Sequence, residues 1–186
     1  LAPLTNIATA LVCAPSLAMK IRAIVLMGGA IGLGNVTPAA EFNFYVDPHA
    51  AARVFASGVP IVMIPLEATH QALATPAWVE AVRELGTRTS GAIAEMLAPG
   101  LERSAKRRRA GVPVHDACVI GYLLWPELFH TIHGHVAIET HSALTMGRSV
   151  VDLRGRLGLG ANATVVESIE VDPFFVRMRE RLAALP

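Results

Sequence analysis

The sequence predicts an α/β fold in three layers, with a mostly parallel sheet flanked by helices. Near-continuous apolar runs over residues 21–27 and 59–66 are typical of strands buried on both faces. Helical patterns alternate with these runs through residues 1–125, which favours parallel strands joined by helices. Apolar residues make up 53% of the 186 residues and aromatic ones only 5%, so aliphatic side chains must build the interior. The length suits a single domain over 1–186.

Proline and capping residues mark where several helices begin. Asp47 precedes Pro48 and Thr75 precedes Pro76, which places a cap before a proline at the first helical position. We expect Pro99 and the following glycine to end a helix, after which the helical pattern could resume. The helices predicted on these grounds cover residues 5–12, 48–57, 76–85, 86–97, 116–124 and 172–185, the first of them capped by Thr5 or Asn6 and the fifth by Asp116.

The residue pattern changes from helical to strand-like after Pro126. Alternating and β-branched residues predict strands over 132–139, 149–153 and 163–170. These strands would add to the sheet toward the C-terminal end of the chain.

Charge and cysteine content exclude several classes of function. The net charge is +1, so no strong field attracts nucleic acid or a membrane surface. No apolar stretch reaches the ~18 residues of a spanning helix. The only basic run, over residues 103–109, is explained by a solvated helix end. Two cysteines are too few for a disulfide scaffold, which favours a reducing, cytoplasmic location.

The segment 34–43 is the first candidate site. It follows an apolar run that stops at the pair Gly28-Gly29, as loops do at the carboxyl ends of parallel strands, where ligands bind. Its side chains Asn35, Glu41 and Asn43 offer donors and acceptors for hydroxyl groups, and the absence of Lys and Arg favours a sugar over a phosphate. The alternative is that the three side chains only bond to nearby backbone.

Histidines supply the other candidates. His115 precedes Asp116, whose carboxylate could simply cap the next helix. His70 follows the second apolar strand and should lie at the ligand-bearing edge, where we interpret it as structural, with a role beside the site as the alternative. The histidines after Asp116 have no cysteine or carboxylate in zinc-like spacing, so we interpret them as surface residues; they are His130, His133, His135 and His141.

Several of these segments, in this order, resemble the inosine-uridine preferring nucleoside hydrolases. The resemblance covers essentially the whole chain and is weakest over 72–110 and after about residue 155. The segments that carry it are residues 3–8 (PLTNIA), 27–29 (MGG), 34–43 (GNVTPAAEFN), 46–48 (VDP), 65–66 with 69–71 (PL and THQ) and 114–118 (VHDAC).

The resemblance implies a nucleoside hydrolase fold and cleavage of ribonucleosides to ribose and free base. It implies that Asn35, Glu41 and Asn43 hydrogen-bond the ribose hydroxyls while Met27 lies against the sugar. A ribonucleoside is then the expected small-molecule partner, with no nucleic acid or membrane partner and with a homo-oligomer as a possibility.

The resemblance also implies a Ca²⁺ cofactor. Asp116 and the backbone carbonyl of Thr5 match two of its ligands, and His115 matches a residue that faces the leaving base and could protonate it. The general base belongs to an Asp-rich motif that is missing here, since no Asp precedes Asp47.

We therefore expect the fold to be incomplete at its N-terminus. The chain alone is expected to bind calcium weakly and to turn over nucleosides negligibly. Two alternatives stay open: a non-catalytic remnant of such an enzyme, and a module that binds a sugar or nucleoside without hydrolysing it.

Overall fold

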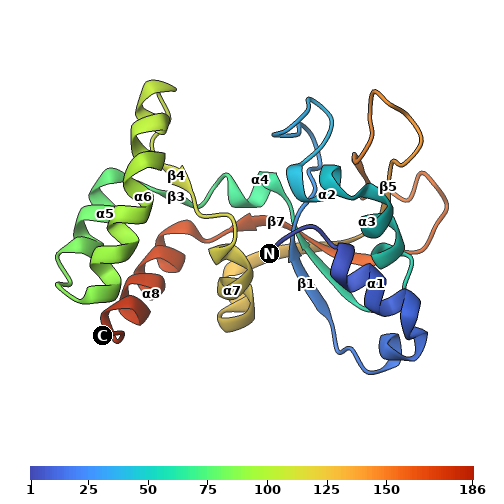
Figure 1. Ribbon diagram of the computed structural model, residues 1–186, viewed down its shortest axis with the longest axis horizontal. Helices are drawn as coiled ribbons and strands as arrows, with labels where there is room; N and C mark the ends of the chain where they lie inside the picture. The colour runs from blue at the N-terminus through green and yellow to red at the C-terminus, as the bar shows by residue number, and fades with distance from the viewer. The chain divides into compact units, whose positions relative to one another are not determined.

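The computed structural model describes residues 1–186 and divides them into two compact units (Figure 1). The first comprises residues 1–68 and 129–168, and the second comprises residues 69–128 and 169–186. Each unit is described by itself.

A five-stranded mixed sheet forms the centre of the first unit. Its strands stand in the order β1 (Ile24–Met27), β2 (Ile61–Ile64), β7 (Ala163–Ile169), β5 (Phe129–Ile138) and β6 (Ser149–Asp152). The first three run parallel, and β5 and β6 pair antiparallel. The predicted α/β fold is confirmed, including the strands added toward the C-terminal end. The apolar run 59–66 gives a shorter strand than expected, because a new helix begins at Leu66.

Five helical segments belong to the first unit, and all but the last contribute side chains to a core shared with the sheet. They are α1 (Thr5–Cys13), η1 (Pro15–Met19), α2 (Phe42–Val46), α3 (Pro48–Phe55) and α4 (Leu66–Thr69), the last of which ends at the first residue of the second unit. Helices α1 and α3 lie beside each other in Figure 1, and both place fully or nearly buried side chains in the core. The Phe44 and Phe55 rings meet edge to face at 5.7 Å there.

A predicted side-chain cap is present at the start of α3 and absent at the start of α1. Asp47 accepts a hydrogen bond from the Ala50 amide at 2.9 Å, so the predicted cap of α3 is confirmed. The predicted cap of α1 is wrong, because the N-cap residue is Leu4 and no side chain caps the helix. The Thr5 hydroxyl instead donates to Asp47 Oδ2 at 2.6 Å, which ties α1 to the start of α3.

The second unit is mainly helical. It contains α5 (Pro76–Arg83), α6 (Arg88–Lys106), α7 (Ala117–Leu124), η2 (Pro126–Leu128) and α8 (Val171–Ala183), with a small antiparallel sheet of β3 (Leu73–Ala74) and β4 (Val112–Pro113). Thr75 caps α5 as predicted, through a bond from the Trp78 amide. None of the helices is both long enough and apolar enough to span a bilayer.

The predicted break at Pro99 is wrong, because α6 continues through it as one 19-residue helix. Proline removes only one amide from the helical ladder. Pro99 lies on the exposed side, whereas Ala94 is fully buried and Gly100 lies against Val112 of β4. Packing on the inner side therefore outweighs the local cost of the proline.

Candidate functional site

The chain leaves β1 through a glycine turn whose geometry requires glycine. Gly29 has φ +72°, and a Cβ there would lie 2.5 Å from Met63 Cε. A Cβ on Gly28 would lie 2.6 Å from Phe44 Cε1. Any side chain at either position would collide with the core, so the predicted turn follows from close packing as well as from backbone freedom.

Two distant side chains hold the amides that follow this turn. Ser149 Oγ accepts from the Ala30 amide at 2.8 Å and donates to the Ala30 carbonyl at 2.6 Å. The Glu67 carboxylate accepts from the Ile31 and Gly32 amides, both at 2.8 Å. Hydrogen bonds to a carboxylate are among the stronger ones in proteins, so this part of the loop is firmly held.

The segment 34–40 folds back on itself. The Ala40 carbonyl accepts from the Asn35 amide at 3.2 Å and from the Val36 amide at 3.3 Å. A Cβ on Gly34 would lie only 2.1 Å from that carbonyl oxygen, which excludes any other residue at this position. The fold-back returns the chain to β1 just before Glu41.

Glu41 is the anchor of the candidate sugar site. Its side chain is only 2% exposed, and its carboxylate caps α2 by accepting from the amides of Asn43 at 2.9 Å and Phe44 at 3.3 Å. It also accepts from the Gly29 amide at 3.0 Å. A buried carboxylate is costly unless it is hydrogen-bonded, and these three amides satisfy it.

The other predicted sugar-binding residues lie around this anchor. Asn43 Nδ2 donates to the Met27 carbonyl at 3.0 Å, and Asn35 Oδ1 accepts from the Phe42 amide at 2.9 Å. Met27 itself is only 4% exposed. The structure thus brings Met27, Asn35, Glu41 and Asn43 together at the carboxyl end of β1, with the backbone contacts that the structural alternative expects. Their role toward ribose stays a prediction.

His115 belongs to the second unit, where it lies beside Thr69 and His70. Its Nδ1 is 2.8 Å from Thr69 Oγ1, and its ring meets the His70 ring edge to face at 5.5 Å. Burial lowers the pKa of His115 below its ordinary value, and the neighbouring His70 lowers it further, against the opposite effect of Asp116. The neutral imidazole is therefore favoured.

Asp116 stands at the N-cap position of α7 but makes no side-chain capping bond. The simpler interpretation, that it only caps the helix, is therefore not supported by the hydrogen bonding. Its carboxylate is exposed. Two residues on, Cys118 is fully buried and its Sγ donates to the Val114 carbonyl at 3.3 Å, as is typical of a structural thiol.

The predicted metal ligands do not by themselves fit a calcium ion. The Thr5 carbonyl accepts from Thr9 Oγ1 at 2.8 Å. No group of three or more His, Cys, Asp or Glu side chains is placed to hold a metal. Two oxygens fall short of the six to eight that Ca²⁺ takes.

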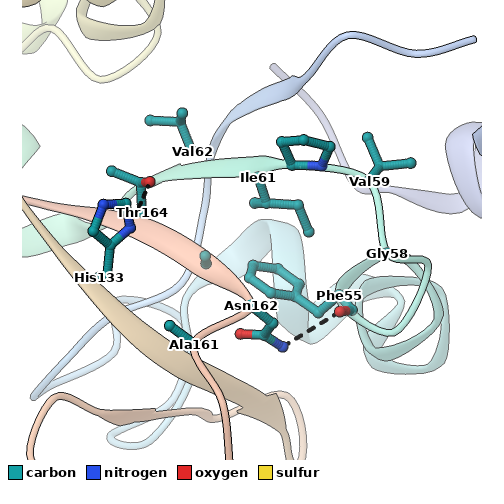
Figure 2. Close-up of a pocket in the computed structure, with 11 residues that line it drawn as sticks. Phe55, Gly58, Val59, Ile61, Val62, His133, Ala161, Asn162 and Thr164 are labelled. Atoms are coloured by element: carbon teal, nitrogen blue, oxygen red, sulfur yellow. Dashed lines mark hydrogen bonds between the residues drawn. The ribbon is translucent and has the colours of Figure 1, made fainter. Parts of the chain in front are cut away.

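A pocket of about 430 Å³ opens at the other end of the strands (Figure 2). Ile61 and Thr164 line it near the amino ends of β2 and β7. His133 lies beside Thr164, with its Nδ1 3.2 Å from Thr164 Oγ1. Asn162 donates to the Phe55 carbonyl at 3.3 Å across the pocket floor. None of the sequence-predicted site residues lines this pocket.

Sequence reasoning missed three residues that shape the two candidate sites. Glu67 could have been found, because it follows a parallel strand at the edge where the loop after β1 also emerges. Thr69 lies in a segment that carried the family resemblance, but nothing in its spacing gave it a role. Ser149 carried no signal, since its partner Ala30 is 119 residues away.

Comparison with known proteins identifies the family of the chain. The chain matches the family described as inosine-uridine preferring nucleoside hydrolase over residues 1–176. It is 44% identical over 183 residues to a pyrimidine-specific ribonucleoside hydrolase RihA of Klebsiella pneumoniae, and 46% identical over 183 residues to that of Citrobacter koseri. Both matches cover 97% of this chain, which spans 59% of the length of each relative.

Solved structures give the same result. A purine-preferring ribonucleoside hydrolase from Gardnerella vaginalis matches with a TM-score of 0.87 at 31% identity, over 98% of this chain and 58% of that one. A plant nucleoside hydrolase matches with a TM-score of 0.89 at 27% identity, over 100% of this chain and 61% of that one. Fold, motif order and sequence identity agree, and the chain belongs to the inosine-uridine preferring nucleoside hydrolase family.

Proposed function

We propose that the protein acts in hydrolysing the N-glycosidic bond of ribonucleosides to ribose and free base. The observation that supports this most is the loop after β1, which gathers Met27, Asn35, Glu41 and Asn43 around one buried carboxylate. The relatives named above are hydrolases of pyrimidine or purine ribonucleosides, so the preferred base is left unassigned.

In this proposal the loop binds the ribose. Asn43 Nδ2 is tied to the Met27 carbonyl, which fixes the orientation of the amide and directs its oxygen to a ligand hydroxyl. Asn35 is exposed, and its bonded oxygen leaves the amide nitrogen as a donor. Cleavage passes through an oxocarbenium-like sugar, so hydroxyls held in a fixed pucker favour the transition state over the relaxed substrate.

His115 acts on the leaving base. A departing base gains negative charge unless a proton or a donor neutralises it, and an imidazole N–H can serve as that donor. The half-buried ring with one nitrogen on Thr69 is held in place for such a contact.

Calcium belongs to the proposal through the family resemblance, with Asp116 and the Thr5 carbonyl as two of its ligands. Because these two oxygens do not make a site, no step is assigned to the ion. We expect the 186-residue polypeptide on its own to release no ribose. Homo-oligomer formation and a cytoplasmic location stay predictions.

The test uses a chimera, in which this chain is fused to the part of the pyrimidine-specific relative that it does not match. The chimera should release ribose from uridine or inosine, and the 186-residue chain should not. In the chimera, Asn43→Ala should lower kcat/KM about 100-fold or more, because a buried polar contact to the transition state is lost. Thr131→Ala, on an exposed position of β5, is the matched control.

An unchanged kcat/KM in Asn43→Ala would refute the ribose site. Ribose release by the 186-residue chain would refute its expected inactivity.

Binding without hydrolysis is the second candidate. The loop after β1 is held by Glu41, Glu67 and Ser149, all of which belong to the first unit. Only two oxygens are predicted to bind the metal, so the chain has more of a sugar site than of a metal site. Ribose or nucleoside binding by the 186-residue chain, with an inactive chimera, would favour this module over the hydrolase.

A further inference from the structure

We propose that Thr69 positions His115 by donating its hydroxyl proton to Nδ1, which holds the imidazole as the Nε2–H tautomer. The proposal rests on the proposed function, in which His115 faces the leaving base. It adds a residue that acts on the substrate only through His115.

Thr69 is built as a rigid support. It is the last residue of α4 and is 0% exposed, and its Oγ1 lies 2.8 Å from His115 Nδ1. Because the Thr69 side chain is fully buried among close-packed neighbours, its hydroxyl oxygen has little freedom to move away. A half-buried imidazole bonded to such a group has a fixed ring plane.

The backbone holds the two residues in register. The Thr69 carbonyl accepts from the Ala72 amide at 3.2 Å, and the Ala72 carbonyl accepts from the Val114 amide at 3.0 Å. The next residues pair as β3 and β4, with Leu73 opposite Pro113. The segment that carries His115 is therefore bonded to the turn that carries Thr69, within one compact unit.

The direction of the hydrogen bond decides what the other nitrogen can do. A neutral imidazole carries one N–H, and the partner of one nitrogen determines which nitrogen has the proton. If Thr69 donates to Nδ1, the proton is on Nε2, where it can be donated to a leaving base. If Thr69 accepts, Nε2 has only a lone pair and cannot donate.

The experiment reads the tautomer directly in the 186-residue chain, without substrate. Ring ¹⁵N shifts of His115 are measured at about pH 8.5, above the ordinary histidine pKa of about 6.5, and are assigned by their loss in His115→Phe. Wild type and Thr69→Ser should show the Nε2–H form. Thr69→Val removes the hydroxyl but keeps the shape, and should change the tautomer ratio about fivefold toward Nδ1–H.

Thr75→Val is the matched control, since it removes a threonine hydroxyl from the cap of α5 in the same unit. It should destabilise the unit without moving the His115 signals. A wild-type ring in the Nδ1–H form overturns the proposal, even if Thr69→Val fails to fold, and so does an unchanged ratio in a folded Thr69→Val. Neither result depends on ribose release, so a failure here is distinguishable from a failure of the proposed hydrolysis.

Discussion

The two cysteines differ in environment and should differ in reactivity. Cys13 is exposed at the end of α1, and Cys118 is fully buried. Burial raises the pKa of the Cys118 thiol to about 12, and the nearby Asp116 charge acts in the same direction. Because the thiolate is the reactive form, a thiol reagent should label one cysteine in the native chain and two in urea. Cys13→Ser should abolish native labelling, and rapid labelling that persists in this variant would contradict the burial of Cys118.

Asp47 should make stability depend on pH. The hydrogen bond from the Thr5 hydroxyl, and next the Ala50 amide, lower the pKa of Asp47 below its usual value. Its contribution is therefore fully present above the unfolded-state pKa of about 3.9 and is lost as pH falls through the folded value. Thr5→Val should raise the Asp47 pKa in an NMR titration and reduce the loss of folding stability at low pH. Thr5→Ser keeps the hydroxyl, so the low Asp47 pKa and the loss of stability at low pH should both remain. An Asp47 titration that is identical in Thr5→Val would disprove the role given to this hydroxyl.

At the scale of elements, α6 carries two glycines that should respond oppositely to alanine. A Cβ on Gly91 meets no atom within 4 Å, so Gly91→Ala should stabilise the chain by about 0.5–1 kcal/mol through helix propensity. A Cβ on Gly100 would lie 2.9 Å from Val112 Cγ2, so Gly100→Ala should gain less or destabilise. Urea unfolding of both variants checks this, and an equal gain at the two sites would contradict the packing of α6 on β4.

Elements were predictable where local chemistry decides them. The Asp47 and Thr75 caps and the strands after Pro126 follow from residues that are adjacent in the chain. Pro99 was misjudged because contacts with β4, distant in sequence, outweigh its local penalty. The short helix α2 was missed because its cap, Glu41, was assigned to a loop and to a ligand, whereas it also serves the Asn43 and Phe44 amides.

For the whole molecule, calcium should have little effect on the stability of this chain. Anything that binds only the folded state raises its stability in proportion to the logarithm of its concentration over Kd. Two oxygens are far fewer than the six to eight that Ca²⁺ takes, so millimolar Ca²⁺ should leave Tm unchanged, with Mg²⁺ as the matched ion. A Tm that rises with Ca²⁺ but not with Mg²⁺ would show that the chain holds further ligands.

The family and the position of the sugar loop were predictable from motifs in the correct order. The division into two compact units was not, because it depends on which distant segments pack together. The prediction of a single domain over 1–186 stays a prediction. Two of the supporting residues were also unpredictable, since Ser149 and Thr69 bond to partners that are 119 and 46 residues away.

The anchoring of the loop after β1 has a consequence for synthesis. Ala30 and Glu67 leave the ribosome well before Ser149, which follows Glu67 by about 80 residues, or roughly 4–16 s at ordinary elongation rates. During that interval the nascent loop lacks the two hydrogen bonds that Ser149 makes with Ala30. Translation pauses before β6 should therefore prolong a window in which this loop is vulnerable to proteases.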